Sequence, residues 1–261
     1  MSRLPILPEC YTVFIAGPVS SGKTWLMRQW ALQKERVLIH DVSMDFSSDE
    51  YTHINDPVAL CDRLIENPYY YRIAYHVNPD SVEQEFSWEY RAIWTQEQPR
   101  WFFIDEVSQV CRNNAMHRDM RTILQLSRHD LLGVVAASQR IADVDKSLTD
   151  ASRMTILFRT DEATSLDAIY QRWGKEVCDS VSNLRPCIYD DVNKIVHQEP
   201  ECVVVLKGRG FKVIPLGSKI QSEQESQQWE QVLTHQDAQD GQEAPEQPSI
   251  PEHFSEENTG Q

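Results

Sequence analysis

The sequence predicts an α/β fold in which a central, mostly parallel β-sheet is flanked by helices on both faces. Short apolar runs alternate along the chain with segments whose apolar residues recur at helical spacing. The central runs are apolar at every position, which is typical of strands buried on both faces of a parallel sheet. The 261 residues are enough for one large domain or two small ones with a buried core.

Six short runs have the length and composition of strands. They cover residues 11–16, 37–39, 72–77, 101–104, 132–137 and 154–158. Two more runs, at 202–206 and 211–215, flank a glycine-containing turn and predict a C-terminal β-hairpin across 207–210.

Five longer segments predict helices. They cover residues 23–33, 57–65, 81–96, 115–127 and 162–173. The first places Leu26, Met27 and Trp30 on one face, and the pattern over 57–65 is weaker. The segment over 115–127 turns Met120 and Ile123 inward, together with Met116 and Leu124.

The last 41 residues differ in composition from the rest of the chain. Residues 221–261 hold ten of the 40 acidic residues, none of the 25 basic ones and few large apolar groups. Such a segment cannot bury enough surface to offset its ordering entropy, so we expect a folded domain over 1–220 and a disordered acidic tail over 221–261. The net charge of −15 argues against a protein that coats nucleic acid by bulk attraction, but not against a ring that presents a few Arg or Lys inward.

The six cysteines show no CxxC pair and no zinc-site spacing, so we expect reduced thiols in a cytosolic protein. No secretory leader pattern and no apolar run of about 18 residues occurs, which predicts no membrane insertion.

A complete phosphate-binding motif, G-x-x-x-x-G-K-[ST], lies between the first strand and the first helix. Its residues are Gly17, Pro18, Val19, Ser20, Ser21, Gly22, Lys23 and Thr24. The glycines let the backbone wrap around phosphate oxygens, which the helix N-terminus attracts. We expect Lys23 to reach the β- and γ-phosphates of ATP and the Thr24 hydroxyl to ligate Mg²⁺. The alternative is a Gly/Ser turn with an exposed lysine.

Two carboxylates, Asp105 and Glu106, close the apolar strand at 101–104. After a phosphate-binding loop, the first acid of such a pair holds Mg²⁺, and the second can activate the attacking water as a general base. The alternative is a strand that simply ends in solvent.

Polar residues Ser138 and Gln139 end the strand at 132–137. If this strand neighbours both the loop strand and the acidic strand, Gln139 faces the γ-phosphate and could orient water. The alternative is an ordinary transition from strand to turn.

Several arginines are candidates for a finger that stabilises the transition state in a neighbouring subunit. Arg128 is preferred because it leads into the polar-tipped strand, whereas Arg118 and Arg121 fit a solvated helix face equally well. The competing candidates are Arg140, Arg153 and Arg159.

Taken in order, the phosphate-binding motif, Phe103-Ile104-Asp105-Glu106 and Ser138-Gln139-Arg140 resemble the FtsK/HerA superfamily of DNA-pumping ATPases. The resemblance covers residues 11–173. In its small size the chain is similar to the genome-packaging ATPases of membrane-containing icosahedral phages. Ser138 stands where family members usually have Thr, and Ile141 where they have Pro.

The resemblance implies a RecA-like (ASCE) core, hydrolysis of ATP with Mg²⁺, and translocation of double-stranded DNA by a homo-oligomeric ring, usually a hexamer. It further implies a location in the host cytoplasm or virion and contact with capsid or portal vertex proteins. Two other interpretations stay open: an AAA-type ATP-dependent switch for transposition or replication, and a nucleotide-binding scaffold of a capsid or secretion complex.

Overall fold

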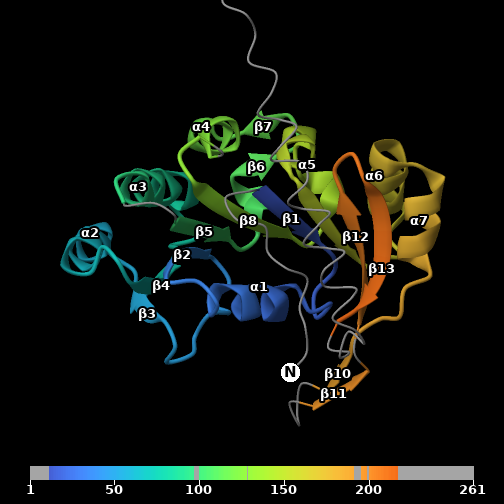
Figure 1. The fold of residues 1–261 in the computed structure, drawn as a ribbon, viewed down its shortest axis with the longest axis horizontal. Helices are drawn as coiled ribbons and strands as arrows, with labels where there is room; N and C mark the ends of the chain where they lie inside the picture. Colours follow the sequence, from blue (N-terminus) through green and yellow to red (C-terminus); the bar gives the residue numbers. More distant parts are fainter. Residues whose placement is uncertain (1–11, 97–99, 128, 191–194, 199, 217–261) are drawn as a thin grey trace, which may run out of the picture. The chain divides into compact units, whose positions relative to one another are not determined.

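The computed structural model describes residues 12–96, 100–127, 129–190, 195–198 and 200–216. The predicted tail over 221–261 and Arg128 therefore lie outside the described residues. One nine-stranded sheet forms the centre of the fold (Figure 1). In order across the sheet its strands are β13 (Gly210–Pro215), β12 (Glu201–Leu206), β9 (Met154–Phe158), β1 (Thr12–Ala16), β8 (Leu132–Ser138), β5 (Arg100–Ile104), β2 (Arg36–Asp41), β4 (Tyr71–His76) and β3 (Thr52–Ile54).

The strands from β9 to β3 run parallel, and β12 and β13 form an antiparallel hairpin at the edge beyond β9. β1, β5, β8 and β9 are buried at every position. This burial confirms the prediction of a mostly parallel sheet covered on both faces, and the C-terminal hairpin is also confirmed.

Helices lie on both sides of the sheet. Figure 1 shows α1 (Lys23–Ala31) on one side of β5 and β8, and α3 (Val82–Trp94) and α4 (Arg118–Leu126) on the other. The remaining helices are α2 (Pro57–Glu66), α5 (Lys146–Ala151), α6 (Ala163–Trp173) and α7 (Lys175–Ser182). Along α1, the predicted inward residues Leu26, Met27 and Trp30 are all buried.

The predicted helix over 115–127 is wrong in its first turn. Ala115–Met116 form a short strand, β7, which pairs with β6 (Cys111–Arg112) across a turn in which Asn114 has a φ of 61°. The helix starts at Arg118, because the His117 side chain accepts the Asp119 N–H at 3.3 Å and so caps the first turn. α7 and the small hairpin of β10 (Ile188–Asp190) and β11 (Ile195–Gln198) were not predicted.

The strand order determines which chain segments can meet. β8 pairs with β1 on one side and with β5 on the other. All three are parallel, so the residues that follow Ala16, Ile104 and Ala137 lie together at the carboxyl ends of the strands. The described residues include no helix that is both long and apolar enough to span a membrane. The described cysteines are free thiols.

Candidate functional site

The phosphate-binding loop is held at both ends. At its start, the Gly17 N–H donates to the Ser138 carbonyl at 3.2 Å, and at its end the first turn of α1 is closed by Leu26 N–H on the Gly22 carbonyl at 3.0 Å. Ser20 and Gly22 have φ values of 60° and 103°. Left-handed residues of this kind allow the N–H groups of a loop to turn toward one side, which is the geometry of an anion-binding loop.

Phe158, at the end of β9, leaves no room for a side chain at the first glycine. A Cβ on Gly17 would lie 2.5 Å from the Phe158 Cβ, and one on Gly22 would lie 3.5 Å from the Phe158 ring. The first glycine is therefore required by packing and the second by its positive φ.

Lys23 lies buried inside its own loop. Its Nζ donates to the Gly17 carbonyl at 2.6 Å and to the Pro18 carbonyl at 2.8 Å. Burial lowers the pKa of the Lys23 ammonium, and the charges of Glu106 and Asp105 oppose that change. A buried cation beside two carboxylates argues against the alternative of a Gly/Ser turn with an exposed lysine.

Asp105 is a buried carboxylate, 5% exposed, at the carboxyl end of β5. Burial raises its pKa to about 6, the charges of Asp45 and Asp41 add to this, and a hydrogen bond with the Ser43 side chain opposes it. A buried carboxylate next to other acids is a strong ligand for a divalent cation, which would remove the repulsion.

Glu106 is held by the tip of β8. Its φ of 53° turns the chain sharply after β5. The carboxylate accepts the Ser138 hydroxyl at 3.1 Å, the Gln139 N–H at 3.2 Å and the Ser108 hydroxyl at 2.5 Å. The acidic strand end and the polar strand end thus form one hydrogen-bonded unit. Gln139 joins it through its backbone, while the residue itself is exposed.

A third strand end, which the sequence analysis missed, completes this edge of the site. Asp41, the last residue of β2, is buried and accepts the N–H groups of Asp45 and Phe46 at 3.0 and 3.2 Å. These bonds close a loop that carries Ser43 and Asp45 toward Asp105 and Lys23. The signal was present: His40-Asp41 follows an apolar run in the same way as Asp105-Glu106.

Two stacked histidines support Asp41 from the outer side of the sheet. The rings of His53 and His76 are 5.1 Å apart and nearly parallel, and His76 Nδ1 lies 3.2 Å from the Asp41 carboxylate. This contact fixes the end of β4 to the end of β2, next to the loop that reaches the site.

Two of the six candidate arginines form ion pairs within the chain. Arg140 pairs with Glu162 and, at 3.5 Å, with Asp143, and Arg159 lies 3.3 Å from Asp161. Arg118 and Arg121 are exposed on α4. Arg128, the preferred candidate, lies outside the described residues, so its role stays a prediction.

A cavity of about 530 Å³ opens beside the phosphate-binding loop, between the loop, the end of β9 and the start of β12. It is lined on one side by the loop residues Pro18 to Ser21 and on the other by Arg159 and the Arg185–Glu201 ion pair, which is 2.8 Å long. Its volume is in the range of small-molecule sites, so a nucleoside has room next to a phosphate bound at Lys23.

The residues present fit a nucleotide and a hard cation. The Ser21 hydroxyl is buried in the loop without a hydrogen-bond partner, and such orphaned groups call for a ligand or water. Thr24 follows Lys23 on α1, and Asp105 supplies the acidic oxygen that Mg²⁺ prefers.

We expect the metal-free protein to lose stability as Asp105 ionises. Its pKa in the folded protein, about 6, exceeds the unfolded value of 3.8. The folded state therefore binds this proton more tightly than the unfolded state does. The cost of ionising the buried carboxyl to the stability of the fold is absent below pH 4 and complete above pH 6. The free energy of unfolding of the Asp105→Asn variant, relative to that of wild type, should therefore rise by about 2 kcal/mol from pH 4 to pH 7.5. Urea unfolding at both pH values, without divalent metal, measures this difference. A difference between the two proteins that does not change with pH would contradict it.

Comparison with solved structures shows that the chain has the fold of a P-loop NTPase. The genome packaging NTPase B204 of Sulfolobus turreted icosahedral virus 2, in complex with AMPPCP, matches with a TM-score of 0.63 at 17% identity, over 78% of this chain and 96% of that chain. The same NTPase in complex with sulfate matches at 0.62 and 16%, over 80% and 96%. B204 of Sulfolobus turreted icosahedral virus, described as a DNA-packaging ATPase, matches at 0.61 and 16%, over 80% and 98%.

No family model matches the chain, and a comparison with curated proteins gives no match. At this level of identity the likeness concerns the fold, and it confirms the fold that the resemblance to FtsK/HerA ATPases implied.

Proposed function

We propose that the protein is an ATPase that converts hydrolysis into movement of double-stranded DNA, and that its task is packaging of a viral genome. One observation carries the proposal. β8 lies between β1 and β5, so the phosphate-binding loop and the Asp105–Glu106 pair lie together at the carboxyl ends of these strands, with Lys23 buried between them. A lysine and two carboxylates in this arrangement suit phosphoryl transfer to water, in which positioning and charge stabilisation do most of the work.

Each residue then has one task. The amides of residues 17–24 and the Lys23 ammonium bind the phosphates, and Thr24 and Asp105 hold Mg²⁺. When bound, Mg²⁺ neutralises charge that develops on the transferred phosphoryl group. Glu106 orients water and takes up its proton, and Gln139 senses the γ-phosphate. Arg128 acts across a subunit interface.

The fold likeness to B204 supports the packaging task, because B204 is a DNA-packaging ATPase of about the size of the matched region. We propose that residues 1–220 form the ATPase domain, that 221–261 form a separate acidic tail, and that copies assemble into a hexameric ring around the duplex. Such a ring would work in the host cytoplasm, or attached to the virion at a capsid or portal vertex.

The decisive experiment is the steady-state ATPase rate with and without long linear duplex DNA. A motor should be stimulated by any long duplex, regardless of sequence. Stimulation by a protein partner alone would instead favour the regulatory switch, and no turnover under either condition would favour the scaffold. Either result would overturn the proposed function.

A further inference from the structure

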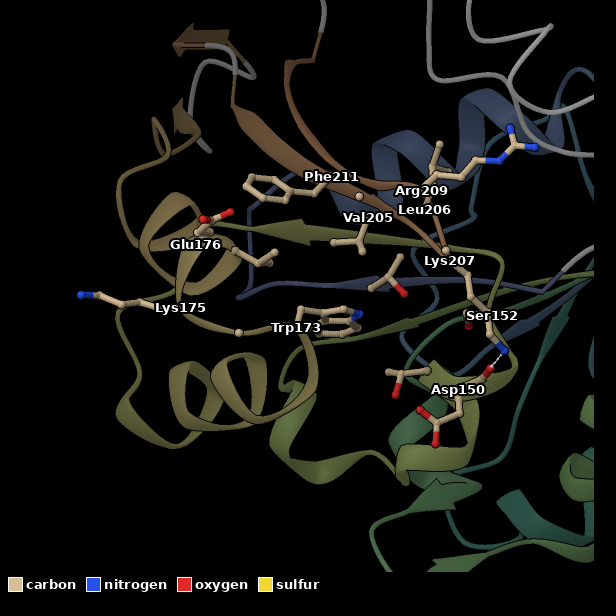
Figure 2. A pocket seen from close by; sticks show the side chains of 16 residues that line it. Asp150, Ser152, Trp173, Lys175, Glu176, Val205, Leu206, Lys207, Arg209 and Phe211 are labelled. Atoms are coloured by element: carbon tan, nitrogen blue, oxygen red, sulfur yellow. Dashed lines mark hydrogen bonds between the residues drawn. The ribbon is translucent and has the colours of Figure 1, made fainter.

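A second cavity lies at the amino end of β9, whereas the phosphate-binding loop lies at the carboxyl ends of the parallel strands. It has a volume of about 650 Å³ and opens between the turn of the β12–β13 hairpin, the start of β9 and the junction of α6 with α7. Figure 2 shows the Trp173 indole in its centre, with Val205 and Phe211 of the hairpin on one side. Among the residues that the structure describes, none with a proposed part in ATP hydrolysis lines it.

The rims of this cavity carry positive charge. Lys207 and Arg209 come from the hairpin turn and Lys175 from the start of α7, and in Figure 2 Arg209 and Lys175 extend from opposite rims. The hairpin segment over 202–216 contains no Asp or Glu. The hairpin rim of the cavity is therefore cationic. Two acids, Asp150 and Glu176, also line the cavity.

The floor of the cavity offers few groups for specific recognition. The hydroxyls of Thr149 and Ser152 already donate to the carbonyls of Lys146 and Leu148, at 2.8 and 2.7 Å. Gly174, Gly208 and Gly210 line the cavity, and a Cβ built on any of them meets nothing within 4 Å. Open backbone and cations at the rims favour a ligand that is recognised by charge and not by shape, as a phosphate backbone is.

β9 connects this cavity to the ATP site. At its start, the Lys207 N–H donates to the Arg153 carbonyl at 3.0 Å, and Thr155 of β9 lines the cavity. At its end, Phe158 packs against Gly17 and Gly22 of the phosphate-binding loop. β9 is paired on both sides, with β1 and β12, so it is a rigid element that runs from the cavity to the phosphate-binding loop.

We propose that this groove binds the phosphate backbone of duplex DNA and that occupancy stimulates ATP turnover through β9. The inference rests on the proposed function, since it names the surface through which the duplex acts. Arg209 and Lys175 bind phosphates from the two rims. Lys207 contributes charge but is also structural, because its Nζ donates to the Asp150 carbonyl at 2.5 Å.

The test compares two variants that change the charge of the protein equally. Lys175→Gln/Arg209→Gln removes the two rim cations, and Arg63→Gln/Arg91→Gln removes two cations from α2 and α3. Binding of a fluorescent duplex is measured with a non-hydrolysable ATP analogue over a range of salt, and ATP turnover with and without duplex. The rim variant should bind about 10-fold more weakly, with a salt slope reduced by about 2, and should lose DNA stimulation while keeping its basal rate. The α2/α3 variant should behave as wild type.

The outcomes separate this inference from the proposed function. If wild type neither binds duplex nor responds to it, both fail. If duplex DNA stimulates wild type and the rim variant equally, the groove does not bind the duplex, and an acidic protein partner would fit it instead. This result overturns this inference alone. An equal loss in both variants would show a bulk effect of charge and would also overturn it.

Discussion

Replacing Lys23 with alanine should abolish ATP hydrolysis and most nucleotide binding. The Lys23 ammonium is buried and within 2.8 Å of two loop carbonyls, so it lies where phosphate oxygens are expected and has lost most of its hydration. Charge-assisted contacts in such a site contribute about 1.5–3 kcal/mol each to binding, and the loss of a preorganised cation costs at least about 100-fold in rate. Steady-state phosphate release and equilibrium binding of a fluorescent ATP analogue measure the two effects.

Lys146→Ala is the matched control, because Lys146 is an exposed lysine at the start of α5, away from the loop. It should keep the wild-type rate and affinity. Circular dichroism and the unfolding midpoint establish that both variants fold. A folded Lys23→Ala protein that still hydrolyses ATP at the wild-type rate would refute the assignment of the loop.

Replacing Glu106 with glutamine should separate binding from hydrolysis. Glutamine keeps an oxygen that can accept the Ser138 hydroxyl or the Gln139 N–H, so the link between β5 and β8 survives. It cannot take up a proton from water, and loss of a general base costs about 100- to 10,000-fold in rate. We therefore expect a slow enzyme that binds ATP with near wild-type affinity, measured by single-turnover hydrolysis and by retention of labelled ATP.

Glu83→Gln, an exposed carboxylate in the first turn of α3, controls for the loss of one negative charge. It should leave both quantities unchanged. If Glu106→Gln hydrolyses ATP as fast as wild type, another carboxylate activates water, and Asp45 on the loop after β2 is the first one to test.

The sequence predicted the two motifs of the site because each has fixed spacing and a strand beside it. It could not predict that β8 separates β1 from β5, since the order of strands depends on pairings between distant segments. The condition attached to Gln139 is met for this reason, although the contact is made by its backbone and by Ser138.

The loop after β2 was missed for a different reason. The apolar pattern predicts a strand over 37–39 only, because it ends at Ile39, whereas His40 and Asp41 are both buried inside β2. α7 escaped prediction because in its eight residues only Val177 and Val181 are buried. The prediction for the first turn of the 115–127 helix was wrong because it rested on apolar spacing that included Met116. Such spacing cannot distinguish a continuous helix from a short strand that is followed by a helix with a capped N-terminus.

The three hydrogen bonds on Glu106 have a consequence for the idle protein. Three of the roughly four lone-pair positions of the carboxylate are occupied by donors from Ser138, Gln139 and Ser108, which leaves about one position for a water proton. A water that Glu106 activates must therefore approach from the single open side of the carboxylate. Removing the Ser138 hydroxyl opens a second position, so Ser138→Ala should raise the ATPase rate measured without DNA.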